Sequence, residues 1–103
     1  MEKLKKYQQI LVSFLEEYAA INYANAPHLE QQVLADLTRN HFQLVNIGWH
    51  KKQFVYDVVF HFDVKDDMVW IQQNWTDIKL TDELARRGIA PSDMAVGFLP
   101  VLA

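Results

Sequence analysis

The sequence predicts an α+β fold, in which an N-terminal amphipathic helix packs on a four-stranded antiparallel meander that is followed by a short C-terminal helix. Apolar residues recur at helical spacing near the N-terminus, residues 53–65 alternate with a period of two, and turn residues separate the apolar stretches. At 103 residues, with 50% apolar and 22% charged residues, the chain has the size and composition of one globular domain over residues 1–103.

The first element is a predicted helix over residue 2 to about residue 23. Its apolar residues recur every three or four positions and form one stripe: Leu4, Tyr7, Leu11, Phe14, Leu15 and Tyr18. Pro27 cannot continue a helix and biases Ala26 toward an extended conformation, so we expect the helix to end before it. The apolar stripe must cover another element.

Two strands follow over residues 30–38 and 41–49, with Arg39 and Asn40 in the turn between them. Lys51 and Lys52 form the next turn. If each turn is tight, one sheet face collects six apolar side chains, and we expect the helix to cover that face. The six are Val45, Ile47, Trp49, Phe54, Tyr56 and Val58.

The other sheet face is expected to be exposed although it is also largely apolar. Its apolar residues are Val33, Ala35, Leu37, Phe42, Leu44, Val55, Val59 and Trp70. A solvated sheet face should be mostly polar, and an exposed apolar patch usually marks a binding surface. We therefore expect Leu44 and Val59 to contact a companion protein or a second copy of the chain, most simply as a C2 homodimer.

The strand at residues 53–65 is the strongest pattern in the chain, and Asp66 and Asp67 turn it into a partner strand. A two-residue turn pairs Asp63 with Trp70 and His61 with Gln72, which places all four on one face. A turn longer by one residue would move Trp70 to the core face instead.

A short helix is predicted over residues 81–87, after a loop that contains Thr76 and Asp77. Thr81 is the expected N-cap and Gly88 the expected residue after the helix. Residues 91–93 begin one more helical turn. The apolar end of the chain, GFLPVLA, is expected to pack on the sheet or on another subunit.

Composition excludes several classes of protein. There is no cysteine, so disulfides and cysteine-based catalysis or zinc binding are excluded. No apolar run is long enough for a membrane span, and the N-terminus does not resemble a secretion signal, so a cytoplasmic protein without a membrane partner is expected. The net charge of −3 argues against a protein that holds nucleic acid by itself.

His61 and Asp63 project from the same side of one strand and could share a metal ion, which would suit a metal-dependent hydrolase. A metal site needs a third protein ligand, and Asp57 is the only candidate. The simpler interpretation is that His61 hydrogen-bonds to Gln72 and that Asp63 caps the turn. The sequence therefore predicts no metal, no cofactor, no catalytic residue and no small-molecule substrate.

Direct nucleic-acid binding is a second alternative, because three tryptophans could stack on bases. Five lysines would supply the positive charge: Lys3, Lys5, Lys6, Lys51 and Lys52.

Several motifs closely resemble the XisI family, the fdxN-element excision controlling factors. They are QLVNIGW at residues 43–49, HFDVKDDMVWIQ at 61–72, T-D at 76–77, D-E-L at 82–84, RGIAPSDM at 87–94 and G-F at 97–98. The family usually has a longer, basic C-terminus after Phe98 and glycine at Asp67.

The resemblance implies an accessory role in programmed excision of a DNA element, without catalytic residues of its own. It implies a XisH-type companion protein, with nucleic acid contacted only indirectly. The candidate surface for that contact combines the family motifs with the apolar face: Leu44, Val59, His61, Asp63, Trp70, Gln72, Thr76 and Asp77.

Overall fold

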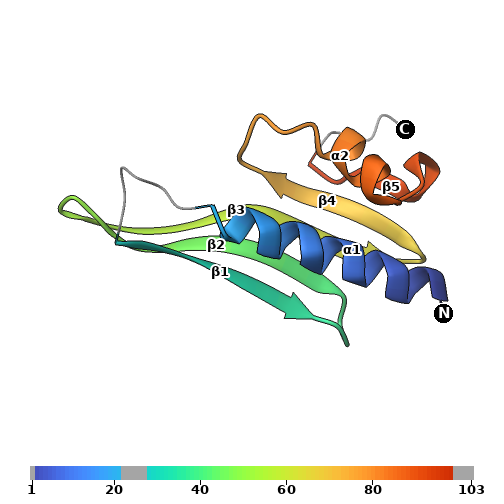
Figure 1. Ribbon diagram of the computed structural model, residues 1–103, viewed down its shortest axis with the longest axis horizontal. Coiled ribbons are helices and arrows are strands. Elements are labelled where there is room, and N and C mark those ends of the chain that lie inside the picture. The colour runs from blue at the N-terminus through green and yellow to red at the C-terminus, as the bar shows by residue number, and fades with distance from the viewer. Residues whose placement is uncertain (1, 22–27, 99–103) are drawn as a thin grey trace.

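The structure is a computed structural model that describes residues 2–21 and 28–98. Its elements are α1 (Glu2–Ala19), β1 (Leu29–Asp36), β2 (His41–His50), β3 (Gln53–Lys65), β4 (Met68–Asn74), α2 (Leu80–Arg87), a 3₁₀ turn (Pro91–Asp93) and β5 (Met94–Val96). The strands lie in the order β1-β2-β3-β4-β5, as Figure 1 shows. The predicted α+β fold and its four-stranded antiparallel meander are confirmed, with a fifth strand added.

The apolar stripe of α1 packs on the sheet as predicted. Tyr7, Leu11, Phe14 and Leu15 are buried, and the Phe14 ring lies 5.2 Å from the ring of Phe60. The helix ends at Ala19, earlier than the sequence predicts. The stop signal at Pro27 and the adjoining segment 22–27 lie outside the described residues.

The prediction of which sheet face α1 covers was wrong for β2 and for the part of β3 before Val59. Val45 pairs with Val58, but Leu44 pairs with Phe60, so Val59 is an extra residue in β3. Such a β-bulge shifts the alternation by one residue. The even-numbered side chains of β3 therefore change faces along the strand, and Phe60, rather than Tyr56, faces the helix.

Leu44 and Val59 consequently belong to the hydrophobic core, with 0% and 5% of their surface exposed. The core cluster under α1 also contains Phe42, Phe60, Phe62, Val64, Val69 and Ile71. The predicted exposed patch around Leu44 and Val59 does not exist. The residues expected beneath the helix lie on the opposite face instead.

Strand β5 was not predicted. It runs parallel to β4, and α2 lies in the connection between them, as a parallel pair requires. Beyond β5, the Gly97 N–H donates to the Ile71 carbonyl at 2.8 Å, and Phe98 is exposed. Residues 99–103 lie outside the described residues, so the expected packing of the terminal segment stays a prediction for that part.

Helix α2 begins one residue before the predicted start. Lys79 is the N-cap and makes no side-chain capping bond, so the prediction of Thr81 as the cap was wrong. Leu80 and Leu84 are buried, and their packing against the core holds the helix in place. Gly88 has a φ of 118° and ends the helix as predicted.

A polar contact joins the 3₁₀ turn to α1. The Tyr7 hydroxyl donates to Oδ2 of Asp93 at 2.6 Å, and the Lys3 ammonium lies 2.9 Å from the same oxygen. Hydrogen bonds from Lys3 and Tyr7 lower the pKa of Asp93. The Tyr7 oxygen also accepts the Ala90 N–H at 3.2 Å, so this contact fixes the segment that leads into β5.

Replacing Asp93 by asparagine is expected to reduce the amount of folding stability that the chain loses when the pH is lowered. Because the folded pKa lies below the unfolded value of about 3.9, Asp93 stabilises the fold above about pH 4 and loses that contribution as pH falls. Urea denaturation at pH 7 and pH 3 should show a smaller loss for Asp93→Asn than for the wild type. Asp82→Asn, an exposed α2 control, should behave as the wild type; equal losses in Asp93→Asn and wild type would contradict the prediction.

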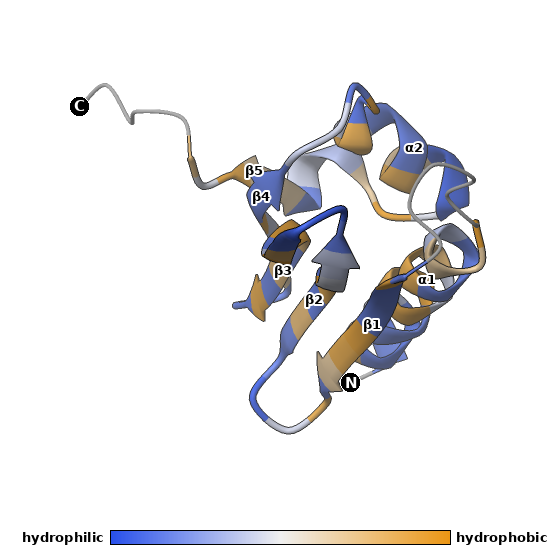
Figure 2. Cartoon of the chain, turned by 90° about the vertical axis from the view of Figure 1, so that its left-hand side faces the viewer, coloured by the Kyte–Doolittle hydropathy of each residue, from blue (hydrophilic) through white to orange (hydrophobic). Residues whose placement is uncertain are grey.

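Both helices lie on the same side of the sheet. Figure 2 looks along the strands and shows α1 and α2 together, whereas no described helix covers the opposite face, which we call the open face. None of the described helices is long and apolar enough to cross a membrane.

Candidate functional site

The open face has two chemically different ends, both built mainly on β2 and β3. We call one the polar end, and its residues are His41, Gln43, His61, Asp63 and Gln72. We call the other the aromatic end, and its residues are Val45, Ile47, Trp49, Phe54, Tyr56 and Val58. These assignments follow from the strand pairing, because His41, Gln43 and Val45 alternate with the buried Phe42 and Leu44.

At the polar end, two histidines converge on one carboxylate oxygen. Nδ1 of His41 lies 2.7 Å and Nε2 of His61 lies 2.8 Å from Oδ1 of Asp63. Gln43 Nε2 lies 2.8 Å from Nδ1 of His61, and Gln72 Nε2 donates to Oδ2 of Asp63 at 3.3 Å. The five side chains therefore form one connected hydrogen-bond network.

The network also fixes the charge of the carboxylate. Partial burial tends to raise the pKa of Asp63, but hydrogen bonds from His41, His61 and Gln72 outweigh it and lower that pKa. The side chain is 16% exposed. Asp63 is thus held as an anion, with both oxygens accepting hydrogen bonds at neutral pH.

The structure confirms the predicted turn and most of the predicted pairing. Asp66 and Asp67 both have positive φ, and Asp63 pairs with Trp70. His61 pairs with Gln73 rather than with Gln72, because β4 has an extra residue at this point. The predicted hydrogen bond from His61 to Gln72 is therefore wrong; His61 contacts Gln43 and Asp63, and Gln72 reaches Asp63.

His41 is the site residue that the sequence analysis missed. A two-residue turn at Lys51 and Lys52 would place His41 opposite Phe62, on the helix side of the sheet. The bulge in β3 moves the pairing by one residue, so His41 lies opposite Asp63. Asp57, the third ligand considered, pairs with Asn46 and lies outside this cluster.

The other predicted surface residues lie apart from the network or at its edge. Trp70 is partly buried, and the Lys65 ammonium lies 5.5 Å from its ring centroid. Thr76 stabilises the β4–α2 loop, since its hydroxyl donates to Asn74 Oδ1 at 2.6 Å and accepts the Ile78 N–H. Asp77 is exposed in the same loop.

Three large aromatic side chains of the aromatic end are exposed to solvent. Trp49, Phe54 and Tyr56 are 57%, 53% and 60% exposed. Trp49 and Phe54 pair directly across β2 and β3, and their rings lie 5.4 Å apart in an edge-to-face arrangement. Val45, which pairs with Val58, is buried but lies outside the core cluster under α1. The aromatic end is therefore a preformed apolar surface.

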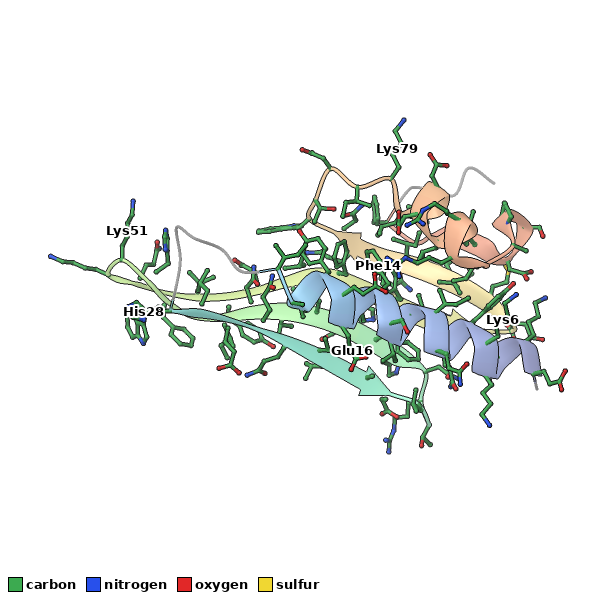
Figure 3. All side chains as sticks on the ribbon, viewed as in Figure 1. Lys6, Phe14, Glu16, His28, Lys51 and Lys79 are labelled. Carbon is green, nitrogen blue, oxygen red and sulfur yellow. The ribbon has the colours of Figure 1, made fainter. Side chains whose placement is uncertain are left out.

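The lysines considered for nucleic-acid binding do not form one patch. Lys6 on α1 and Lys51 at the β2–β3 turn lie at opposite ends of the molecule in Figure 3. Lys3 is paired with Asp93. The structure thus separates the lysines of α1 from those of the β2–β3 turn, and none of the lysines considered lies in the polar end of the open face.

Solved structures similar to this chain come from Anabaena variabilis ATCC 29413. A XisI-like protein is 36% identical, with a TM-score of 0.86 over 94% of this chain and 88% of its own. The fdxN element excision controlling factor XisI is 20% identical, with a TM-score of 0.79 over 95% of this chain and 94% of its own, a likeness of fold. No curated protein matches the sequence.

The sequence itself carries the family assignment. The model of the XisI protein family matches residues 1–102, which is nearly the whole chain. The match includes the strands that carry both ends of the open face, and the XisI-like crystal structure has the same fold at 36% sequence identity. This chain belongs to the XisI family.

Proposed function

We propose that this chain is a non-enzymatic accessory protein of a DNA-excision system, that it acts in the cytoplasm by binding a XisH-type companion protein, and that it contacts DNA only through its partners. Membership of the XisI family supports the role in excision control. The single structural observation that supports protein binding is the exposed aromatic end of the open face.

The aromatic end is suited to protein binding by its composition and its rigidity. Its side chains project from two paired strands, so little backbone ordering is required on binding. Trp and Tyr are frequent in the residues that dominate binding energy at protein interfaces. A second copy of the chain is the competing occupant, and it would place the same surface of two subunits together in a C2 dimer.

Replacing Phe54 or Tyr56 by lysine is expected to weaken companion binding strongly while the chain stays folded. A lysine at the centre of an apolar interface removes an aromatic contact worth about 2 kcal/mol or more, which corresponds to at least about 30-fold weaker binding. The chain should be co-expressed with a XisH-type protein, and the mass of the complex measured by size-exclusion chromatography with light scattering.

Ser13→Lys is the matched control, because it adds the same charge at an exposed position of α1. It should leave the complex intact. A wild-type chain that never binds the companion would overturn the proposed function. If the complex still forms with both Phe54→Lys and Tyr56→Lys, the proposed function remains but the contact surface lies elsewhere on the chain. If the wild type alone has the mass of a dimer that the same variants dissociate, the aromatic end is a self-association surface.

A further inference from the structure

The polar end of the open face brings three potential metal ligands together. His41 and His61 each direct one ring nitrogen at the same oxygen of Asp63. Each residue has one potential ligand atom that lies within 4.8 Å of the ligand atoms of the other two residues. Since zinc binds nitrogen and oxygen donors at about 2.0–2.2 Å, small side-chain rotations would bring the three donors onto one ion.

The chemistry of the donors selects the class of metal. Two imidazoles and one carboxylate suit Zn²⁺ and related divalent transition metals, whereas Mg²⁺ and Ca²⁺ prefer oxygen ligands alone. His61 and Asp63 lie two residues apart on β3, and His41 pairs directly with Asp63 from β2. The three ligands therefore stand on two hydrogen-bonded strands, which hold their backbones in a fixed arrangement.

Two further side chains are placed to support the ligands. Gln43 contacts Nδ1 of His61, the ring nitrogen that faces away from Asp63. With an ion on Nε2, the ring proton moves to Nδ1, and rotation of the Gln43 amide offers its oxygen as the acceptor. Gln72 donates to Oδ2 of Asp63, which leaves Oδ1 for the ion. Such second contacts orient metal ligands and strengthen binding.

There is also room for a fourth ligand. A shallow depression of about 670 Å³ lies over the cluster and is bordered by β1. Its lining includes His41, Gln43, His61 and Asp63. A three-ligand zinc site leaves one coordination position for water or for a group from a binding partner, and the depression would give such a group access to the ligands.

We propose that His41, His61 and Asp63 bind one divalent transition-metal ion of the zinc type. This inference goes beyond the proposed function, because it assigns a binding site that companion binding does not require. It also does not depend on that function: the site is complete within one chain, so metal binding can be measured on the isolated protein.

The test is isothermal titration calorimetry of the full chain, freed of metal with EDTA and dialysed, with Zn²⁺ as the ligand. The expected result is one ion per chain, no binding of Mg²⁺, and the visible absorption of tetrahedral Co²⁺ when cobalt is used instead. His41→Ala should weaken Zn²⁺ binding at least 100-fold. His41 is 55% exposed, so this variant should fold normally. Gln43→Ala should weaken binding about 10-fold by removing a contact that orients His61.

His50→Ala is the matched control, because His50 lies at the far end of β2 and outside the cluster. It should bind Zn²⁺ as the wild type does. The proposal is overturned if the wild type binds no Zn²⁺, if His41→Ala and His61→Ala both bind as tightly as the wild type, or if His50→Ala loses as much affinity as they do. Circular dichroism of each metal-free variant distinguishes loss of ligands from loss of fold.

Discussion

Replacing Leu44 by lysine is expected to prevent the chain from folding. Leu44 is fully buried on the helix side of the sheet and pairs with Phe60. Loss of its packing costs about 2–5 kcal/mol, and burial of an unpaired ammonium adds several more. Together these costs are comparable with the whole stability of a small domain, about 5–15 kcal/mol. Far-ultraviolet circular dichroism and urea denaturation would measure the loss.

Phe54→Lys is the control for this prediction, since it introduces the same charge on a neighbouring strand but on the open face. Phe54 is 53% exposed, so the variant should fold with a urea midpoint close to that of the wild type. A Leu44→Lys variant that unfolds at the wild-type midpoint would mean that α1 does not cover this face. The pair of variants therefore tests the position of the β3 bulge directly.

Replacing Phe60 by alanine is expected to cost about 3–5 kcal/mol in the free energy of unfolding. Its ring is fully buried and lies 5.2 Å from Phe14, 5.0 Å from Tyr18 and 6.1 Å from Phe62. Truncation removes these contacts and leaves a cavity beneath α1. Urea denaturation at pH 7, analysed as a two-state transition, would give the change in free energy.

Trp49→Ala provides the comparison for Phe60→Ala, because it truncates an even larger aromatic side chain. Trp49 is 57% exposed at the aromatic end, so we expect a loss of no more than about 1 kcal/mol. Equal losses in the two variants would contradict the division of the sheet into a helix-covered face and an open face.

These variants distinguish effects on folding from effects on binding for side chains of the same two strands. Side chains of β2 and β3 that face α1 hold the fold together, and those on the open face are available to partners and ligands. Changes at the exposed Trp49, Phe54 and Tyr56 and at His41 should therefore leave the fold intact. Their effects on companion binding and on metal binding can then be attributed to the surfaces themselves.

The sequence by itself determined the two helices, the first four strands and the family. The apolar spacing of α1 and the alternation in β3 are local patterns, and Asp66 and Asp67 can adopt the positive φ that a two-residue hairpin turn needs. Each of these signals depends on residues close together in the chain. The motifs around residues 61–72 likewise resemble the XisI family, to which the sequence match over residues 1–102 assigns the chain.

Only the tertiary structure decided which face of the sheet is buried and which residues meet at the polar end. The bulge at Val59 carries no local signal, yet it turns Leu44 and Phe60 toward α1 and places His41 opposite Asp63. Strand β5 has three residues, which are too few to show the alternation of a strand. It forms because the edge of β4 is available for backbone pairing. Packing over the whole sheet selected the register, because a shift of one residue exchanges the buried and exposed side chains of a strand.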